Sequence, residues 1–306
     1  MSLFKRYFNK KQYDAEQSIT WNEETASSSK GMFWKRFKKH KLAVVGLWFL
    51  SVVTIAAIFA PILAPYGPND ITGNFSAAPS IQHWLGTDQV GRDVLSRVIY
   101  AARVSLTVGI GAVAISAIIG TILGLVSGYF GGLIDGIIMR ITDMFMSFPY
   151  IMFILVVASI VGPGLTNIVI ILGVLGWPGI ARLVRGNVLA IKQSDYVKAS
   201  IALGYSTPRI LFKHILPNTV APILIYATSG VAGAILDEAA LSFLGLGVQP
   251  PDASWGNMLS SAQSISILTN QPWLWIPPGI FILLTVLSIN YIGDALRDAL
   301  DPHNSK

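Results

Sequence analysis

The sequence of 306 residues contains no cysteine, and only 12% of its residues are charged. The lack of cysteine excludes disulfides, thiolate metal sites and lipid attachment through cysteine. A phosphate-binding G-x-x-x-x-G-K-[ST] loop and an H-E-x-x-H zinc motif are also missing, and His40, His83, His214 and His303 are scattered along the chain. No nucleophile with a neighbouring base is apparent. We therefore predict that the chain is not an enzyme and that it binds no metal or cofactor.

Hydrophobic residues are abundant and make up 53% of the chain. A bilayer core about 30 Å thick needs about 20 apolar residues per spanning helix. Six apolar runs of about that length predict an all-α membrane protein with transmembrane helices at about 42–64, 104–126, 141–162, 164–182, 219–243 and 273–293. These helices define a transmembrane domain at 42–296 between tails at 1–41 and 297–306. Glycine and other small residues recur in the second and fifth runs, which permits close contact between helices in lipid.

The formal net charge of +6 is unevenly distributed. Ten of the 22 lysines and arginines lie in the first 41 residues and six lie between 182 and 213, whereas 244–272 has none. The positive-inside rule therefore predicts that both tails and the 182–213 segment are cytoplasmic. Arg92, Arg97 and Arg103 fall on the external side and are exceptions. This distribution argues against nucleic acid as a partner, and the basic, aromatic stretch 32–41 suits contact with anionic membrane lipid.

The stretch between the first two runs predicts an amphipathic helix. A turn around Gly86 is followed by Thr87 and Asp88, either of which can be the helix N-cap. One helical face then contains Val94, Leu95, Val98, Ile99 and Ala102, and the other contains Asp93, Arg97 and Tyr100. We expect this helix to lie at the outer interface and to lead into the second span.

The segment 195–218, DYVKASIALGYSTPRILFKHILPN, is rich in charge for so apolar a chain. Ser194 or Asp195 can cap a first short helix, and Gly204 can end it in the left-handed conformation. Thr207 can cap a second short helix with Pro208 at its first position, and Pro217 marks the approach to the fifth span. A plain connecting loop is one interpretation, but two helices of mixed charge and hydrophobicity on the cytoplasmic side suit docking into a protein groove.

The pattern Lys198-Ala199-Ser200, three residues, Gly204 and then Leu216-Pro217 resembles the EAA loop of ABC importer permeases. The family's glutamate corresponds to Lys198, its second alanine to Ser200, and an expected isoleucine to His214. Two further stretches, 83–106 and 237–259, resemble segments of the C-type permease subunits of dipeptide and oligopeptide importers. The resemblance implies an ATPase-coupling loop at 192–217 with the candidate residues Asp195, Lys198, Ala199, Ser200, Gly204, Pro208, His214, Leu216 and Pro217.

The same resemblance implies a type I ABC importer permease fold in a bacterial inner membrane. The implied partners are a B-type permease, two cytoplasmic ATPases that use ATP and Mg, an extracytoplasmic binding protein and a peptide substrate. Related importers carry nickel or other small solutes, which stays open as an alternative. A secondary transporter would normally need ionisable groups near the middle of the bilayer, and the first, second and fourth runs have none.

Charged pairs near the ends of two spans complete the candidate sites. Asp237 and Glu238 lie near the outer end of the fifth span, where they could form a solvated helix end, could pair with the 245–259 loop, or could contact the binding protein or a peptide's amino terminus at the external mouth. Arg140 and Asp143 are three residues apart at the inner end of the third span, which predicts an intrahelical ion pair.

Overall fold

The computed structural model describes residue 31 and residues 33–300. This part of the chain is helical, and its only β-type pairings are two isolated bridges, Ile71 with Arg92 and Thr87 with Asp93. The helices are α2 Lys41–Ile58, α3 Ala60–Leu63, α4 Val94–Phe130, α5 Gly132–Ser147, α6 Tyr150–Val161, α7 Leu165–Leu175, α8 Trp177–Lys192, α9 Asp195–Ala202, α10 Thr207–Ile210, α11 Leu216–Phe243, α12 Trp255–Leu259, α13 Ile265–Asn270 and α14 Ile276–Leu300. A π-helical turn, Leu211–Ile215, joins α10 to α11, and short 3-10 turns occur at Ser260–Gln263 and Pro272–Leu274.

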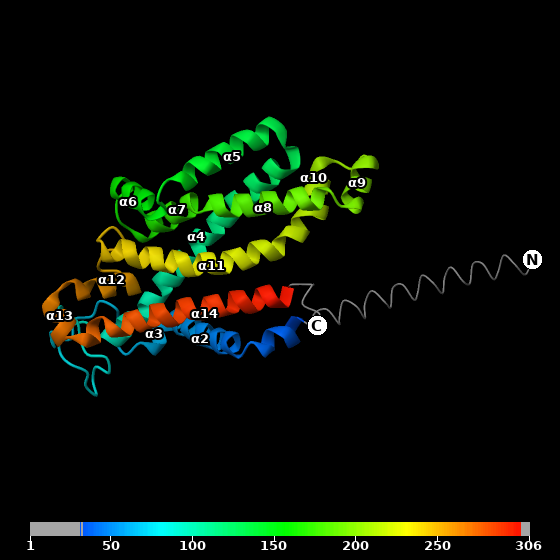
Figure 1. The fold of residues 1–306 in the computed structure, drawn as a ribbon. Coiled ribbons are helices and arrows are strands. Elements are labelled where there is room, and N and C mark those ends of the chain that lie inside the picture. The colour runs from blue at the N-terminus through cyan, green and yellow to red at the C-terminus, as the bar shows by residue number, and fades with distance from the viewer. Residues whose placement is uncertain (1–30, 32, 301–306) are drawn as a thin grey trace, which may run out of the picture.

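The long helices lie roughly side by side, with α4 crossing behind them (Figure 1). At one end of this bundle are α9 and α10, together with the start of α2 and the end of α14 (Figure 1). His40 before α2 and Asp298 of α14 form an ion pair of 3.1 Å between Nε2 and Oδ2 at that end. The loop helices α12 and α13 lie at the opposite end (Figure 1). We call these the coupling end and the outer end, after the roles and the sides of the membrane that the sequence predicts for them.

Five helices in the described residues are long and apolar enough to cross a membrane: Lys41–Ile58, Val94–Phe130, Leu165–Lys192, Thr207–Phe243 and Ile276–Leu300. The predicted third span is not a single helix, because α5 and α6 meet at an angle of 89°. The break lies at Phe148 and Pro149. Phe148 has an extended backbone with φ −89° and ψ 144°, as expected for a residue before proline, since the proline ring disfavours the helical conformation there. The count of six spans holds only if this bent pair is taken as one.

The predicted interfacial helix and second span form one helix, α4, of 37 residues. Its N-cap is Asp93, which accepts a hydrogen bond of 2.8 Å from the backbone N–H of Ser96, so the expectation of Thr87 or Asp88 as N-cap was wrong. Arg97 was expected on the polar face but is buried. The helix begins at the outer end and runs to the α4–α5 turn without a break, because its apolar face continues directly into the membrane-spanning part.

A row of glycines brings α4 into close contact with α8. Gly120, Gly124 and Gly128 lie against Ile180, Val184 and Val188, respectively. A Cβ atom added at Gly124 would lie 2.6 Å from the carbonyl oxygen of Ala181 and 2.6 Å from Cβ of Val184. Three glycines at four-residue spacing lie on one helix face, which allows two backbones to approach closely. The predicted role of small residues in the second span is confirmed.

Candidate coupling site and transmembrane cavity

The segment 192–217, which we call the coupling segment, begins with α9. Ser194 occupies the N-cap position, and its hydroxyl donates to the carbonyl of Ile191 at 2.6 Å instead of capping the helix. At the other end, Gly204 N–H donates to Ile201 O at 2.9 Å and Tyr205 N–H to Ser200 O at 3.1 Å. Gly204 has φ +74°. These two bonds with a left-handed glycine form a Schellman motif, so the predicted helix end at Gly204 is confirmed.

The second half of the coupling segment is not a separate short helix. Residues Thr207–Phe243 form one continuous helix of 37 residues, and its N-cap is Ser206 in place of the expected Thr207. Pro217 therefore lies within a helix and does not mark a boundary. A proline cannot donate its backbone hydrogen bond, and the π-helical turn just before it adjusts the ladder, with Leu216 N–H donating to Leu211 O. The fifth span thus begins inside the coupling segment.

One face of the coupling segment packs on the bundle. Val197, Ile210 and Ile215 are buried in a cluster with Val184 and Val188 of α8. The opposite face leaves large apolar side chains exposed, namely Tyr196, Ile201, Leu203 and Phe212. Leu203 and Phe212 are 72% and 65% exposed. Lys198, Arg209 and Lys213 lie in the same segment, and this mixture of charged and exposed apolar side chains is typical of a surface that docks a protein.

The structure distributes the candidate residues over both faces. Six are exposed: Asp195, Lys198, Ala199, Gly204, Pro208 and Pro217. Ser200 is buried and donates to Tyr196 O at 2.7 Å, Leu216 is half-buried, and the ring of His214 stacks on Tyr205 with centroids 6.1 Å apart. The buried Nε2 of His214 has no hydrogen-bond partner among the described residues. The sequence pattern did not indicate Leu203 and Phe212, two apolar residues that lie outside the buried positions of this segment.

Two ion pairs join α8, the helix that precedes the coupling segment, to α5. Arg185 binds Asp135 through Nε and Nη2 at 2.5 and 2.6 Å. Arg182 Nη2 binds Asp143 at 2.5 Å, so the expected intrahelical pair of Arg140 with Asp143 was wrong. The partner lies 39 residues away on the neighbouring helix. A bidentate arginine–carboxylate pair fixes orientation as well as distance, and α5 is therefore held to α8.

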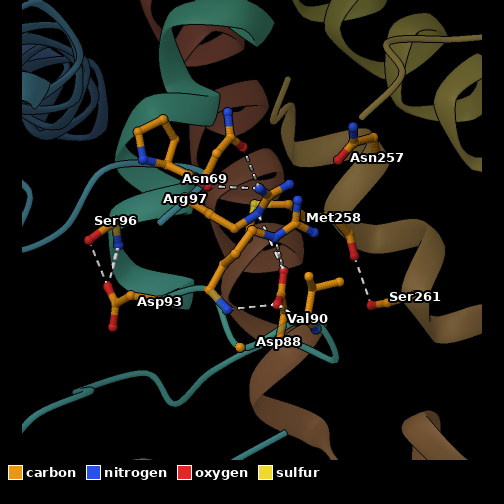
Figure 2. A network of polar contacts seen from close by, with 12 residues as sticks. Asn69, Asp88, Val90, Asp93, Ser96, Arg97, Asn257, Met258 and Ser261 are labelled. Carbon is orange, nitrogen blue, oxygen red and sulfur yellow. Dashed lines mark hydrogen bonds and ion pairs between the residues drawn. The ribbon is translucent and has the colours of Figure 1, made fainter. Parts of the chain in front are cut away.

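At the outer end, a polar network contains Arg92 and Arg97, two of the three arginines that are exceptions to the positive-inside rule (Figure 2). Asp88 lies 2.7 Å from Nε of Arg92 and 3.7 Å from Nε of Arg97. Arg97 also donates to the carbonyl of Pro68 at 2.9 Å, and Figure 2 shows its guanidinium directed toward Asn69 and Asp88. The shared carboxylate of Asp88 offsets part of the positive charge of the two arginines, at the end that the charge distribution predicts to be external.

Glu238 is fully buried at the outer end of α11. Its carboxylate accepts hydrogen bonds from Ser242 at 2.6 Å and from Ser105 of α4 at 3.4 Å. Ser105 Oγ in turn accepts the backbone N–H of Trp255 at 3.2 Å. Glu238 thus joins α11, α4 and α12. Among the alternatives for Glu238, its burial argues against a solvated helix end, and the structure instead links it to the 245–259 loop through Ser105 and Trp255.

Asp237 points to a different environment. It lines a cavity of about 370 Å³ that is formed by residues of α4, of α5 and α6, of α7 and α8, and of α11. Tyr150, Tyr226 and Phe148 also line this cavity. Within the described part of the chain, Asp237 forms no hydrogen bond or ion pair with a side chain. Glu238 is therefore enclosed and hydrogen-bonded within the protein, whereas Asp237 faces the cavity.

Comparison with known proteins gives consistent matches over most of the chain. Residues 120–306 match the family model of the binding-protein-dependent transport system inner membrane component, and residues 30–79 match that of the N-terminal TM domain of oligopeptide transport permease C. A protein of Brucella suis biovar 1 named as a peptide permease is 45% identical over 268 residues, which cover 87% of this chain and 89% of the relative. The glutathione transport system permease protein GsiD of Escherichia coli O6:K15:H31 is 43% identical over 88% and 89% of the two chains.

A solved structure of the MetNI methionine ABC transporter in an inward-facing conformation has a similar fold. The TM-score is 0.54 at 20% identity, over 67% of this chain and 97% of the other. The predicted type I importer permease fold is therefore confirmed, including its all-helical architecture. With one family model covering more than half of the residues and relatives above 40% identity, the chain belongs to the binding-protein-dependent transport system inner membrane components, as a multi-pass, peptide-type ABC importer permease of the bacterial inner membrane.

Proposed function

We propose that the chain is one of two permease subunits of an ATP-driven importer of dipeptides or oligopeptides. The other subunits are a B-type permease, two cytoplasmic ATPases that use ATP and Mg, and an extracytoplasmic binding protein. The names of two groups of relatives, peptide permease and glutathione permease, support a peptide cargo. In this proposal the ATPases bind the nucleotide. This chain forms part of the translocation pathway and moves when the ATPases change conformation.

The observation that supports this role best is the exposed apolar face of the coupling segment. Leu203 and Phe212 project from a segment whose opposite face is packed on α8. Apolar side chains grouped on a charged, water-exposed segment favour a protein partner. A partner that pushes this face acts on α8 through the buried cluster and on α11 through the continuous helix Thr207–Phe243. Both spans would then move together.

The test is transport by the complete complex, reconstituted in proteoliposomes with and without the ATPases. We expect uptake of labelled dipeptides, oligopeptides or glutathione that requires ATP and both ATPases. Uptake of nickel in place of peptides would identify a different cargo, and uptake without ATPases would contradict the proposed function.

A variant of Gly204 tests the coupling segment itself. Gly204→Val places a β-branched residue at φ +74°, where a left-handed conformation costs about 1–2 kcal/mol. We expect ATP hydrolysis without uptake, or loss of the bound ATPases.

The matched control is Gly245→Val at the outer end of α11. Gly245 has φ +80°, open space around its α-carbon, and the same pair of backbone bonds, from Gly245 to Ser242 and from Leu246 to Leu241. The control has the same local strain but leaves the coupling segment unchanged, so the ATPases should remain bound. Normal uptake and normal ATPase binding by Gly204→Val would contradict coupling through this segment.

A further inference from the structure

The cavity contains a carboxylate, that of Asp237, with no hydrogen-bond or ion-pair partner in the described part of the chain. Asp237 lies on α11, one of the helices long and apolar enough to cross the membrane. Ionisable side chains in such segments are costly and usually face a pathway or a partner charge. Every residue that lines the cavity lies in the described part of the chain, and none of them is a lysine or an arginine. The described residues therefore offer Asp237 no cation, although they supply cations to Asp88, Asp135 and Asp143.

Aromatic rings form much of the remaining wall. Tyr150 and Tyr226 line the cavity from α6 and α11, and Phe148 lies at the α5–α6 break. The hydroxyl of Tyr226 lies so close to Gly179 that a Cβ atom there would be 2.0 Å from it, so a glycine at 179 is required for this tyrosine position. The faces of such rings attract ammonium groups. A carboxylate and aromatic rings that line one cavity suit an organic cation with an apolar body.

Besides Asp237 and the two tyrosines, Ser116 is the one polar side chain among the described residues that line the cavity. Ser116 Oγ donates to Gly173 O at 2.8 Å. The adjacent Glu238 faces away from the cavity wall and is hydrogen-bonded to Ser105 and Ser242. The volume of about 370 Å³ falls in the range of small-ligand sites, roughly 300–1,000 Å³, and it holds a group of about the size of one or two amino-acid residues. Asp237 is thus the single acidic group of a cavity of suitable size.

We propose that this cavity binds the α-amino group of the peptide during its passage, with Asp237 as the counter-ion and Tyr150 and Tyr226 as the aromatic wall. The proposal rests on the proposed function for the identity of the cargo. It does not rest on it for the chemistry of the site, which is selectivity for an ammonium group. The two can therefore be tested separately.

Because the chain contains no cysteine, a single introduced thiol reports on the cavity. Gly233 lies one helical turn before Asp237 on the same face, lines the cavity, and has no atom within 4 Å of an added Cβ. In membrane vesicles with the complete complex, Gly233→Cys is labelled with aminoethyl methanethiosulfonate, which carries an ammonium, or with its neutral methyl analogue. We expect the ratio of the two rates to fall roughly tenfold to hundredfold when Asp237→Asn is added, as expected for removal of a unit charge about 6 Å away.

The control thiol is Gly186→Cys on α8, which is exposed and also has free space around its Cβ position. Its rate ratio should not respond to Asp237→Asn. An unchanged ratio at Gly233→Cys would overturn the proposal. So would a thiol that reacts with neither reagent in the assembled complex, because the neighbouring subunit would then fill the cavity.

Transport gives the second measurement. With the reconstituted complex, Asp237→Asn should lower peptide uptake about tenfold or more, and Asp237→Glu should restore most of it, while peptide binding to the isolated binding protein is the same for all three. Equal uptake by the Asn variant would overturn the role in transport. If the wild-type complex imports no peptide at all, the proposed function fails, and the thiol ratio still decides whether the cavity prefers an ammonium group.

Discussion

Replacing Phe212 by serine should weaken the binding of the ATPases to this permease. Phe212 is 65% exposed on the coupling segment. A phenylalanine side chain presents about 200 Å², so roughly 130 Å² is available for burial against a partner. At about 25 cal/mol per Å² this area contributes about 3 kcal/mol, which corresponds to a loss of affinity of about 100-fold. Partial burial would lower the effect in proportion.

The assay is titration of purified ATPase onto the permease pair in nanodiscs, followed by the dissociation constant. Phe75→Ser is the matched control, because Phe75 is 63% exposed and precedes α4 on the outer side. The control removes the same ring from the surface that the ATPase should not contact. An affinity for Phe212→Ser within twofold of that of Phe75→Ser would refute the assignment of this face as the docking surface.

Two predictions concern stability, measured as the free energy of unfolding in mixed micelles. Gly124→Ala should lose about 1–3 kcal/mol, because its Cβ would lie 2.6 Å from a backbone oxygen of α8, whereas Gly136→Ala, with no atom within 4 Å, should lose nothing; equal values would contradict the close contact of α4 with α8. Glu238→Ala should lose about 3 kcal/mol, because it leaves buried serine hydroxyls without their acceptor. Glu238→Gln keeps an acceptor and should lose less than about half of that, and a larger loss would indicate that the charge itself is needed.

The long apolar runs could be located from sequence, because membrane-spanning helices depend on composition over about 20 residues. Gly204 could be assigned for a local reason, since a left-handed helix end favours glycine. The break between α5 and α6 is not predicted by the apolar run, although Pro149 lies within it. A proline in an apolar run can kink a helix or end it, and the neighbouring helices decide between the two.

The interactions that define the site join residues far apart in the sequence, and no local sequence pattern indicates them. Asp143 has an arginine three residues away, which favours an intrahelical pair, yet its partner is Arg182 on another helix. Asp237 and Glu238 are adjacent and chemically similar, and only the fold separates them. One faces the cavity, and the other is enclosed between α11, α4 and α12.

The uninterrupted helix Thr207–Phe243 has a geometric consequence. Phe212 and Asp237 are 25 positions apart on it, or roughly 38 Å at about 1.5 Å per residue. If the helix tilted as a rigid body by about 5° around the point midway between these residues, each would move by roughly 1.6 Å, in opposite directions. That is enough to make or break a hydrogen bond. In the proposed mechanism, the tilt of a single helix links ATPase docking at Phe212 to cargo binding at Asp237. No chain of interacting residues between the two sites is needed.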